Sequence, residues 1–290
     1  MTGRPLRIAT CTRLPEVDAD AGPLAAALAA HGFAAELLAW DDPQVDWDAP
    51  VPTILRSTWN YALDVTAFLA WIDRVAAAGP LWNPAAVVRA NVHKRYLLAL
   101  AARGVPVVPT RLIERGTTAP VAAIAAALGC DRVVIKPEVG AGSLGARVFA
   151  LADETAAAAA HLATLTATGA ALVQPYLTSI DTQAGGPGER SLVWIDGALS
   201  HAIRKHPRFA GDDERIEGPV PIADDERAVA LAALAPLADQ LLYARVDLAR
   251  DATGRPVVME LELVEPSLFF ARGAGAADRY AAGLQRRLGA

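Results

Sequence analysis

The sequence predicts a mixed α/β protein that begins with a small parallel α/β unit. Short apolar runs at residues 6–11, 33–40 and 51–56 have the length and composition of buried strands. Alanine- and leucine-rich stretches at residues 22–31 and 65–78 have the composition of helices, and each is followed by a glycine. The order strand, helix, strand, strand, helix over about the first 85 residues is typical of a parallel sheet covered by helices.

Strands and helices continue to alternate beyond residue 85. A helix is predicted from Asn91 to Arg103, with Gly104 as its C-cap, and further helices at residues 121–128 and 155–168. Strands are predicted at residues 132–136, 147–151 and 171–177. Two more, at residues 191–195 and 199–204, are joined by Asp196-Gly197, which is a strong signal for a tight hairpin turn.

Composition and charge exclude several classes of protein. The chain has 290 residues, of which 53% are hydrophobic and 20% charged, so it is long enough for two or three packed units. A net charge of −5 argues against a nucleic-acid-binding surface as the main role. No apolar run is long enough for a membrane span, and no signal peptide is evident. The two cysteines, Cys11 and Cys130, have no metal-ligand spacing, which favours a reducing cytoplasm.

Three carboxylates mark a predicted hairpin near the C-terminus, formed by residues 243–248 and 257–263. Glu260 and Glu262 are two positions apart on one strand, so they point to the same face, and pairing with the first strand could bring Asp247 there too. Such a cluster repels itself unless a cation joins it, and oxygen ligands suit Mg2+. The alternative is a hairpin whose polar face is simply solvated.

A lysine and a glycine loop follow one another in the middle of the chain. Lys136 ends an apolar strand, and residues 138–145 then supply backbone N–H groups that can bind phosphate oxygens. The loop connects two strands, unlike a P-loop or a dinucleotide-binding turn, and so predicts a flap over phosphates. The alternative is a plain glycine-rich hairpin loop. Two weaker candidates are Lys94 and residues 174–177. Taken alone, each favours the alternative: a solvated helix lysine for Lys94 and an ordinary strand end for residues 174–177.

These motifs, in their order along the chain, resemble the ATP-grasp superfamily over roughly residues 80–270. The resemblance implies a small N-terminal α/β domain followed by two α+β subdomains that clasp ATP. We therefore expect an N-terminal domain at residues 1–85, a central ATP-grasp subdomain at 86–178 and a C-terminal subdomain with a metal site at 179–290.

The resemblance also implies roles for the matching residues. ATP would be bound by two lysines, a phosphate flap and a hinge that holds adenine through its backbone: Lys94, Lys136, Gly140, Gly142, Ser143, Gly145, Gln174, Pro175, Tyr176 and Leu177. Mg2+, with Mn2+ as an alternative, would be bound by Asp247, Glu260 and Glu262. Arg245 is expected to contact the γ-phosphate or a phosphorylated intermediate.

Further candidates come from strand ends and loops. Arg56, Ser57 and Asn60 follow a strand end of the N-terminal unit, where an open α/β sheet binds ligands, although a surface turn is an equal alternative. A basic run from Arg204 and Lys205 to Arg208 ends a strand of the nucleotide-binding sheet; it predicts contacts with anions, and a solvated charged loop is the alternative.

Two positions depart from the family pattern. The last metal position is often asparagine, whereas this chain has Glu262, which keeps an oxygen ligand but adds a negative charge. Glutathione-synthetase-like members have an acidic residue followed two positions later by arginine; here Arg190 directly follows Glu189. Arg190 is thus a substrate-binding candidate that stands one place earlier than the family pattern requires.

The resemblance implies an ATP-dependent carboxylate–amine ligase that acts through an acylphosphate on a small amino-acid-like substrate. Residues 55–61, 173–177, 188–191 and 260–267 are similar to a glutathione-synthetase-like subgroup that includes the O-ureido-serine cyclo-ligase of D-cycloserine biosynthesis. An amino-acid or dipeptide ligase is the main rival. A nucleotide-binding module without catalysis, serving regulation or as a scaffold, is the alternative of a different class. Homodimers are common among such ligases, although no stretch of this sequence identifies an interface.

Overall fold

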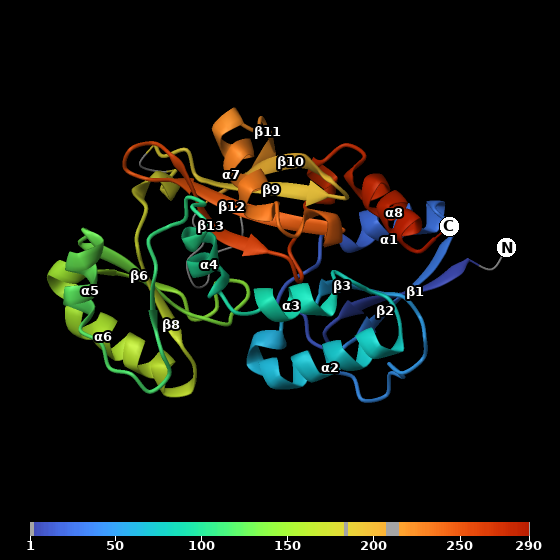
Figure 1. The fold of residues 1–290 in the computed structure, drawn as a ribbon, viewed down its shortest axis with the longest axis horizontal. Coiled ribbons are helices and arrows are strands. Elements are labelled where there is room, and N and C mark those ends of the chain that lie inside the picture. The colour runs from blue at the N-terminus through green and yellow to red at the C-terminus, as the bar shows by residue number, and fades with distance from the viewer. Residues whose placement is uncertain (1–2, 183–184, 207–214, 290) are drawn as a thin grey trace.

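The computed structural model describes residues 3–182, 185–206 and 215–289, and its strands form three separate sheets (Figure 1). One sheet lies within residues 4–82, one within 111–175 and one within 189–262. This mixed architecture agrees with the predicted fold class. The division into domains at residues 85 and 178 stays a prediction.

The N-terminal sheet is parallel, as the strand and helix order predicted. Its strand order is β2 (Phe33–Ala39), β1 (Arg4–Thr10), β3 (Thr53–Ser57) and β4 (Leu81–Trp82). Helix α1 (Ala21–Ala30) packs with Leu6 and Ile8, whereas α2 (Val65–Ala78) packs with Ala9 and Leu55. Because neighbouring residues of a strand point to opposite faces, the two helices cover opposite faces of this sheet.

The middle sheet is antiparallel and has the order β5 (Arg111–Ile113), β8 (Ala171–Pro175), β6 (Arg132–Pro137) and β7 (Arg147–Ala150). Helices α5 (Val121–Leu128) and α6 (Leu151–Thr168) share a core with this sheet. The glycine loop connects β6 to β7, as predicted.

The third sheet is also antiparallel. Its order is β11 (Ile216–Val220), β10 (Ala198–Lys205), β9 (Glu189–Ile195), β12 (Tyr243–Arg250) and β13 (Pro256–Glu262). Helix α7 (Asp224–Leu234) packs on one face, and α8 (Ala276–Arg287) packs with α1 against the other. The predicted Asp196-Gly197 turn joins β9 to β10, and both residues have positive φ, as a tight hairpin turn requires.

The helix predicted from Asn91 to Arg103 is interrupted. Helix α3 (Ala85–Asn91) ends at Asn91, and α4 (Tyr96–Ala102) begins five residues later. The backbone N–H of Lys94 donates to the carbonyl of Glu138, 3.1 Å away, and not to a carbonyl of the preceding turn. This tertiary hydrogen bond places Lys94 in a turn between two helices. Gly104 follows α4 with φ of 80°, as expected for a helix end.

Two buried asparagines connect the segment after the N-terminal sheet to the third sheet. The Asn83 amide donates to the carbonyls of Tyr243 and Leu263, and its oxygen accepts from the N–H of Leu242. Asn91 makes the same kind of contact with the backbone of Leu261 and Leu263. These hydrogen bonds fix the N-terminal sheet beside the β12–β13 pair.

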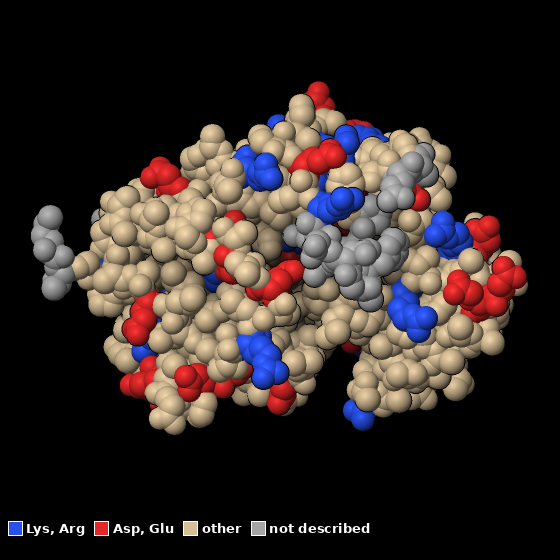
Figure 2. Space-filling model, turned by 180° about the vertical axis from the view of Figure 1, so that it is seen from behind, with Lys and Arg blue, Asp and Glu red and all other residues tan. Residues whose placement is uncertain are grey.

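The exterior carries charges of both signs. On the face drawn in Figure 2, acidic and basic side chains of the described residues are intermixed, without a broad area of one sign. None of the described helices has both the length and the apolar character that crossing a membrane requires.

Candidate active site

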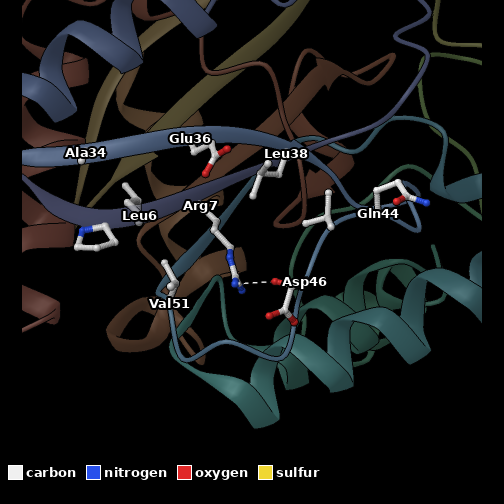
Figure 3. Close-up of a pocket in the computed structure, with 10 residues that line it drawn as sticks. Leu6, Arg7, Ala34, Glu36, Leu38, Gln44, Asp46 and Val51 are labelled. Carbon is white, nitrogen blue, oxygen red and sulfur yellow. Dashed lines mark hydrogen bonds between the residues drawn. The ribbon is translucent and has the colours of Figure 1, made fainter.

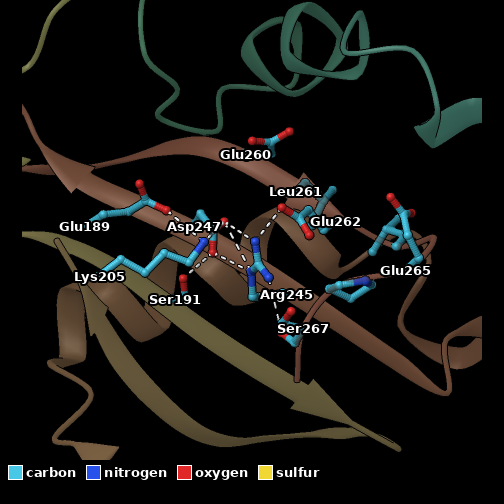
Figure 4. A network of polar contacts seen from close by, with 12 residues as sticks. Glu189, Ser191, Lys205, Arg245, Asp247, Glu260, Leu261, Glu262, Glu265 and Ser267 are labelled. Atoms are coloured by element: carbon cyan, nitrogen blue, oxygen red, sulfur yellow. Dashed lines mark hydrogen bonds and ion pairs between the residues drawn. The ribbon is translucent and has the colours of Figure 1, made fainter. Parts of the chain in front are cut away.

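The strongest polar network lies on one face of the third sheet. Arg245 and Asp247, two residues apart on β12, point to this face, and the Arg245 guanidinium contacts both carboxylate oxygens of Asp247 at 2.9–3.2 Å. Lys205, at the end of β10, places its ammonium 3.2 Å from Asp247 Oδ2. Glu262 of β13 lies opposite Arg245 and pairs with it. Figure 4 shows that these side chains converge from neighbouring strands.

Two further residues of this network were not predicted. The Ser191 hydroxyl donates to Asp247 Oδ1 at 2.5 Å, and Glu189 Oε1 accepts from Lys205 at 3.2 Å. Both lie on β9, one position to either side of Arg190. The period of two along a strand was the signal that could have identified them as a pair on one face.

Charge compensation differs among these carboxylates. Burial alone would raise the pKa of Asp247, but Arg245, Lys205 and the Ser191 hydroxyl together hold it well below its usual value. For Glu262, burial and the nearby Asp247 and Glu260 outweigh Arg245 and raise the pKa to about 7. Asp247 is therefore a fixed anion at neutral pH, whereas Glu262 is close to its titration point.

A second group of charges brings the two predicted ATP-binding lysines together with Glu260. The Lys94 ammonium lies 3.1 Å from Glu260 Oε1 and donates to the Gly140 carbonyl at 2.6 Å. Burial, with Lys94 nearby, lowers the pKa of Lys136, and Glu260 partly offsets this. Glu260 lies opposite Asp247 in the β12–β13 register. The two charge groups therefore meet along one strand pair.

The glycine loop is anchored at both ends. Arg95 pairs with the buried Glu138 at the start of the loop, and the Gly145 carbonyl accepts from a ring nitrogen of His161 at 2.9 Å. Gly142, Ser143 and Gly145 have φ of 58–75°, a conformation that glycine adopts without strain. Neither Arg95 nor Glu138 was predicted; the direct succession of Glu138 after Lys136-Pro137 was the available signal.

The predicted hinge residues lie at the end of β8. The Gln174 amide donates to Thr110 Oγ1, and the N–H of Tyr176 donates to the carbonyl of Arg132. The Arg132 guanidinium lies 4.1 Å from the centre of the Tyr176 ring. The strand ends at Pro175, so Tyr176 and Leu177 lie just beyond the sheet ladder.

Three predicted substrate residues are already engaged by other groups of the protein. Arg56 is buried and binds Asp18 and Asp20, and it also donates to the carbonyl of Pro266. Ser57 Oγ lies 2.8 Å from the Thr10 hydroxyl. Asn60 bridges Asp41 and the Trp40 indole. Their predicted contacts with substrate remain untested.

Arg190 and Arg204 lie apart from the network. Arg190 lies between Glu189 and Ser191, so it points to the opposite face of β9, where it contacts Glu226 of α7. Arg204 lies opposite Arg190 and pairs with Glu217 of β11. The structure therefore brings Lys205, but neither arginine, to Asp247. Arg208 of the same basic run lies outside the described residues.

The predicted metal ligands fit Mg2+ by their chemistry. In residues 3–182, 185–206 and 215–289, no three carboxylate, imidazole or thiol side chains form a complete metal site. Mg2+ does not need one, because it is commonly bound by one or two carboxylates together with substrate phosphates. Asp247 and Glu260 supply oxygen donors at facing positions of one strand pair, and Lys94 lies beside Glu260.

A separate pocket lies on the outer side of the N-terminal sheet. It has a volume of about 390 Å3 between β2 and residues 44–51, and Arg7, Glu36 and Gln44 are among its lining residues (Figure 3). The Arg7 guanidinium donates to the carbonyl of Asp46 at 2.7 Å and so holds this segment to β1. The pocket contains none of the predicted site residues.

Comparisons with known proteins agree on one family. Residues 6–83 match the family model for the N-terminal domain of D-cycloserine synthetase DcsG. The cycloserine biosynthesis protein DcsG of Streptomyces lavendulae is 37% identical over 293 aligned positions, which cover 94% of this chain and 95% of that protein. The crystal structure of D-cycloserine synthetase DcsG matches with a TM-score of 0.89 and 35% identity, over 98% of this chain and 99% of that one.

A more distant structure shares the fold. The ATP-grasp ligase PsnB, solved with a minimal precursor, Mg and ADP, matches with a TM-score of 0.64 and 19% identity over 99% of each chain.

Proposed function

Because the chain belongs to the D-cycloserine synthetase family of ATP-grasp ligases, we propose that it is a cyclo-ligase that joins a carboxylate to a nitrogen of the same amino-acid-like substrate. The predicted membership of the ATP-grasp superfamily is confirmed, and the chain is an ATP-dependent ligase. The non-catalytic module is accordingly set aside. Intramolecular closure is the finer part of the proposal and rests on the named activity of the relatives.

The observation that carries the proposal is the meeting of cations and carboxylates along β12 and β13. Asp247 and Glu260 face each other there, with Lys94 beside Glu260 and with Lys205 and Arg245 beside Asp247. Phosphoryl transfer depends mainly on positioning and on neutralising charge, and this arrangement supplies both. The proposal needs no side-chain nucleophile.

The proposed reaction has two steps. A carboxylate oxygen of the substrate attacks the γ-phosphorus of ATP, and ADP leaves, which gives an acylphosphate. A nitrogen of the same molecule then attacks the carbonyl carbon and loses a proton, and inorganic phosphate leaves with the former carboxylate oxygen. Arg245 and Lys205 would bind the transferred phosphoryl group, because both are cationic and are held in place by Asp247.

Binding of ATP would use the groups that the sequence indicated. Lys94 and Lys136 would contact the phosphates, the loop from Gly140 to Gly145 would cover them, and the backbone at residues 174–177 would hold the adenine. Asp247 and Glu260 would hold Mg2+. Glu262 would be the third ligand, at the position where the family often has asparagine. The metal would neutralise phosphate charge and orient the ATP.

Arg190 and Arg204 have no part in the proposed chemistry, because they lie on the α7 face of the sheet. We propose a structural role for Arg56, since its guanidinium is already bound by two carboxylates. A cytoplasmic location belongs to the proposal and is supported by the two free cysteines. A homodimer is proposed only because dimers are common among the ligases that this sequence resembles.

The test is Mg2+-dependent release of ADP with O-ureido-D-serine, amino acids and dipeptides as substrates, with mass detection of products. The proposal expects O-ureido-D-serine to stimulate ADP release and to give a ring-closed product. Its mass is lower than that of the substrate by one water if the carbamoyl group stays on the ring nitrogen, or by the elements of CO2 and NH3 if that group is lost and D-cycloserine forms. A linear product from two amino acids would replace the cyclo-ligase with an intermolecular ligase. Absence of ADP release with every substrate would contradict the proposal.

A further inference from the structure

Glu265 is a buried carboxylate without a cation of its own. It follows β13 in the segment that leads to Pro266, and only 9% of its surface is exposed. Among the described residues, its side chain has no hydrogen-bond or ion-pair partner. The neighbouring acids differ: Glu189 has Lys205, Glu260 has Lys94 and Glu262 has Arg245.

An unpaired buried carboxylate is costly when it is ionised. Burial, followed by repulsion from Glu262 and Glu260, raises the pKa of Glu265 to about 8, although Lys94 and Arg245 pull it downward. A cation arriving from outside would satisfy this group. Because such a cation would lower this pKa and pair with the ionised carboxylate, the position suits a ligand that carries a positive charge.

The backbone of Glu265 is tied to the N-terminal unit. Its backbone carbonyl accepts from the Trp59 indole at 3.0 Å, which ties it to the segment after β3. Figure 4 shows the Glu265 carboxylate on the same side of the hairpin as those of Glu260 and Glu262. The side chain thus stands at the junction of the N-terminal unit with the proposed phosphoryl-transfer site.

We propose that Glu265 binds the α-ammonium group of an amino-acid-like substrate and selects substrates that carry it. This inference rests on the proposed function. An ammonium group next to the reacting carboxylate suits a single carboxylate, because it is a compact cation with three hydrogen-bond donors. Mg2+ is the less suitable occupant, since Asp247 and Glu260 already offer it a facing pair of ligands.

The test compares two substrates in two proteins. The substrates are O-ureido-D-serine and its analogue in which hydrogen replaces the α-amino group; the proteins are wild type and Glu265→Gln. The analogue is measured as a substrate where it turns over and as a competitive inhibitor where it does not. Should another amino acid prove to be the substrate, that amino acid and its deamino counterpart are used instead.

We expect KM for the ammonium-bearing substrate to rise about 10- to 100-fold in Glu265→Gln, the size expected for a lost charge-assisted hydrogen bond. Binding of the deamino analogue, KM for ATP and the Mg2+ requirement should stay unchanged. The discrimination between the two substrates should therefore shrink by the same factor. Glu265→Asp should restore part of it, because it returns the charge with a shorter reach.

Glu226→Gln is the matched control, since Glu226 is another buried glutamate but lies on α7 and pairs with Arg190. It should leave discrimination unchanged. Undiminished discrimination in Glu265→Gln, a raised Mg2+ requirement, or equal weakening of both substrates would overturn the inference while leaving the ligase intact. If the wild-type protein fails to release ADP with every substrate tested, that result would instead contradict the proposed function, and the inference with it.

Discussion

The ammonium of Lys205 lies 3.2 Å from Oδ2 of Asp247, although the two residues are 42 positions apart in the chain. The same ammonium lies 3.2 Å from Glu189. Lys205 lies between two acids and is partly buried, and the attraction of these acids raises its pKa despite the opposing effects of burial and Arg245. It is therefore a permanent cation, positioned beside the residue that we propose as a magnesium ligand.

The neighbouring residues Lys205 and Arg204 should behave very differently when replaced. Lys205→Met should lower kcat by about 100-fold or more, the size typical of a lost electrostatic contact with the transition state. Arg204→Met should leave kcat close to wild type, because Arg204 points to the other face and pairs with Glu217. Steady-state ADP release measures both. A large loss in Arg204→Met with normal Lys205→Met activity would reverse the assignment.

A single bulge decides which of these two basic residues faces the site. The Asp196-Gly197 turn sets Ile195 opposite Ala198, and an unbroken ladder would then set Arg204 opposite Glu189. The register shifts between Leu199 and His201, so Lys205 takes that position. A one-residue shift moves a side chain to the other face, and no sequence signal located the bulge.

Other parts were predictable because local signals decide them. Asp64 caps α2, which spans the predicted residues 65–78, and periodicity alone placed Glu260 and Glu262 on one face. The interruption at Lys94 was not predictable in this way. It depends on a hydrogen bond to Glu138, 44 positions along the chain, and helix periodicity carries no information about such a partner.

Removing either proposed magnesium ligand should abolish turnover without removing the fold. We expect Asp247→Asn and Glu260→Gln each to reduce ADP release by about 100- to 1,000-fold, because the phosphates lose their metal while side-chain volume is kept. Asp225→Asn is the control, since Asp225 pairs with Arg250 at the surface. Circular dichroism would verify folding, and turnover near the wild-type rate in both site variants would refute the assignment.

Arg56 should matter for stability more than for substrate binding. Arg56→Met leaves Asp18 and Asp20 buried without their cation, which should lower the free energy of unfolding by about 3–5 kcal/mol. Arg74→Met, which breaks the exposed pair with Asp48, should change little. Urea unfolding measures the free energy of unfolding, and KM of the folded Arg56→Met variant measures substrate binding. A raised KM with unchanged stability would restore the predicted role in substrate binding.

Glu265 should make the free protein less stable as the pH rises. Its pKa is raised from the usual 4.5 to about 8 in the folded protein, so folding favours the protonated form. The resulting stabilisation is complete below pH 4.5 and is lost between there and pH 8, where the folded protein must ionise an unpaired carboxyl.

Glu265→Gln removes this dependence, so its stability relative to wild type should increase with pH, by at most about 1.4 kcal/mol per pH unit. Urea unfolding of both proteins from pH 5 to pH 8.5, with Glu226→Gln as the control, measures the slope, and parallel curves for wild type and Glu265→Gln would show that Glu265 already has a cation in the free protein.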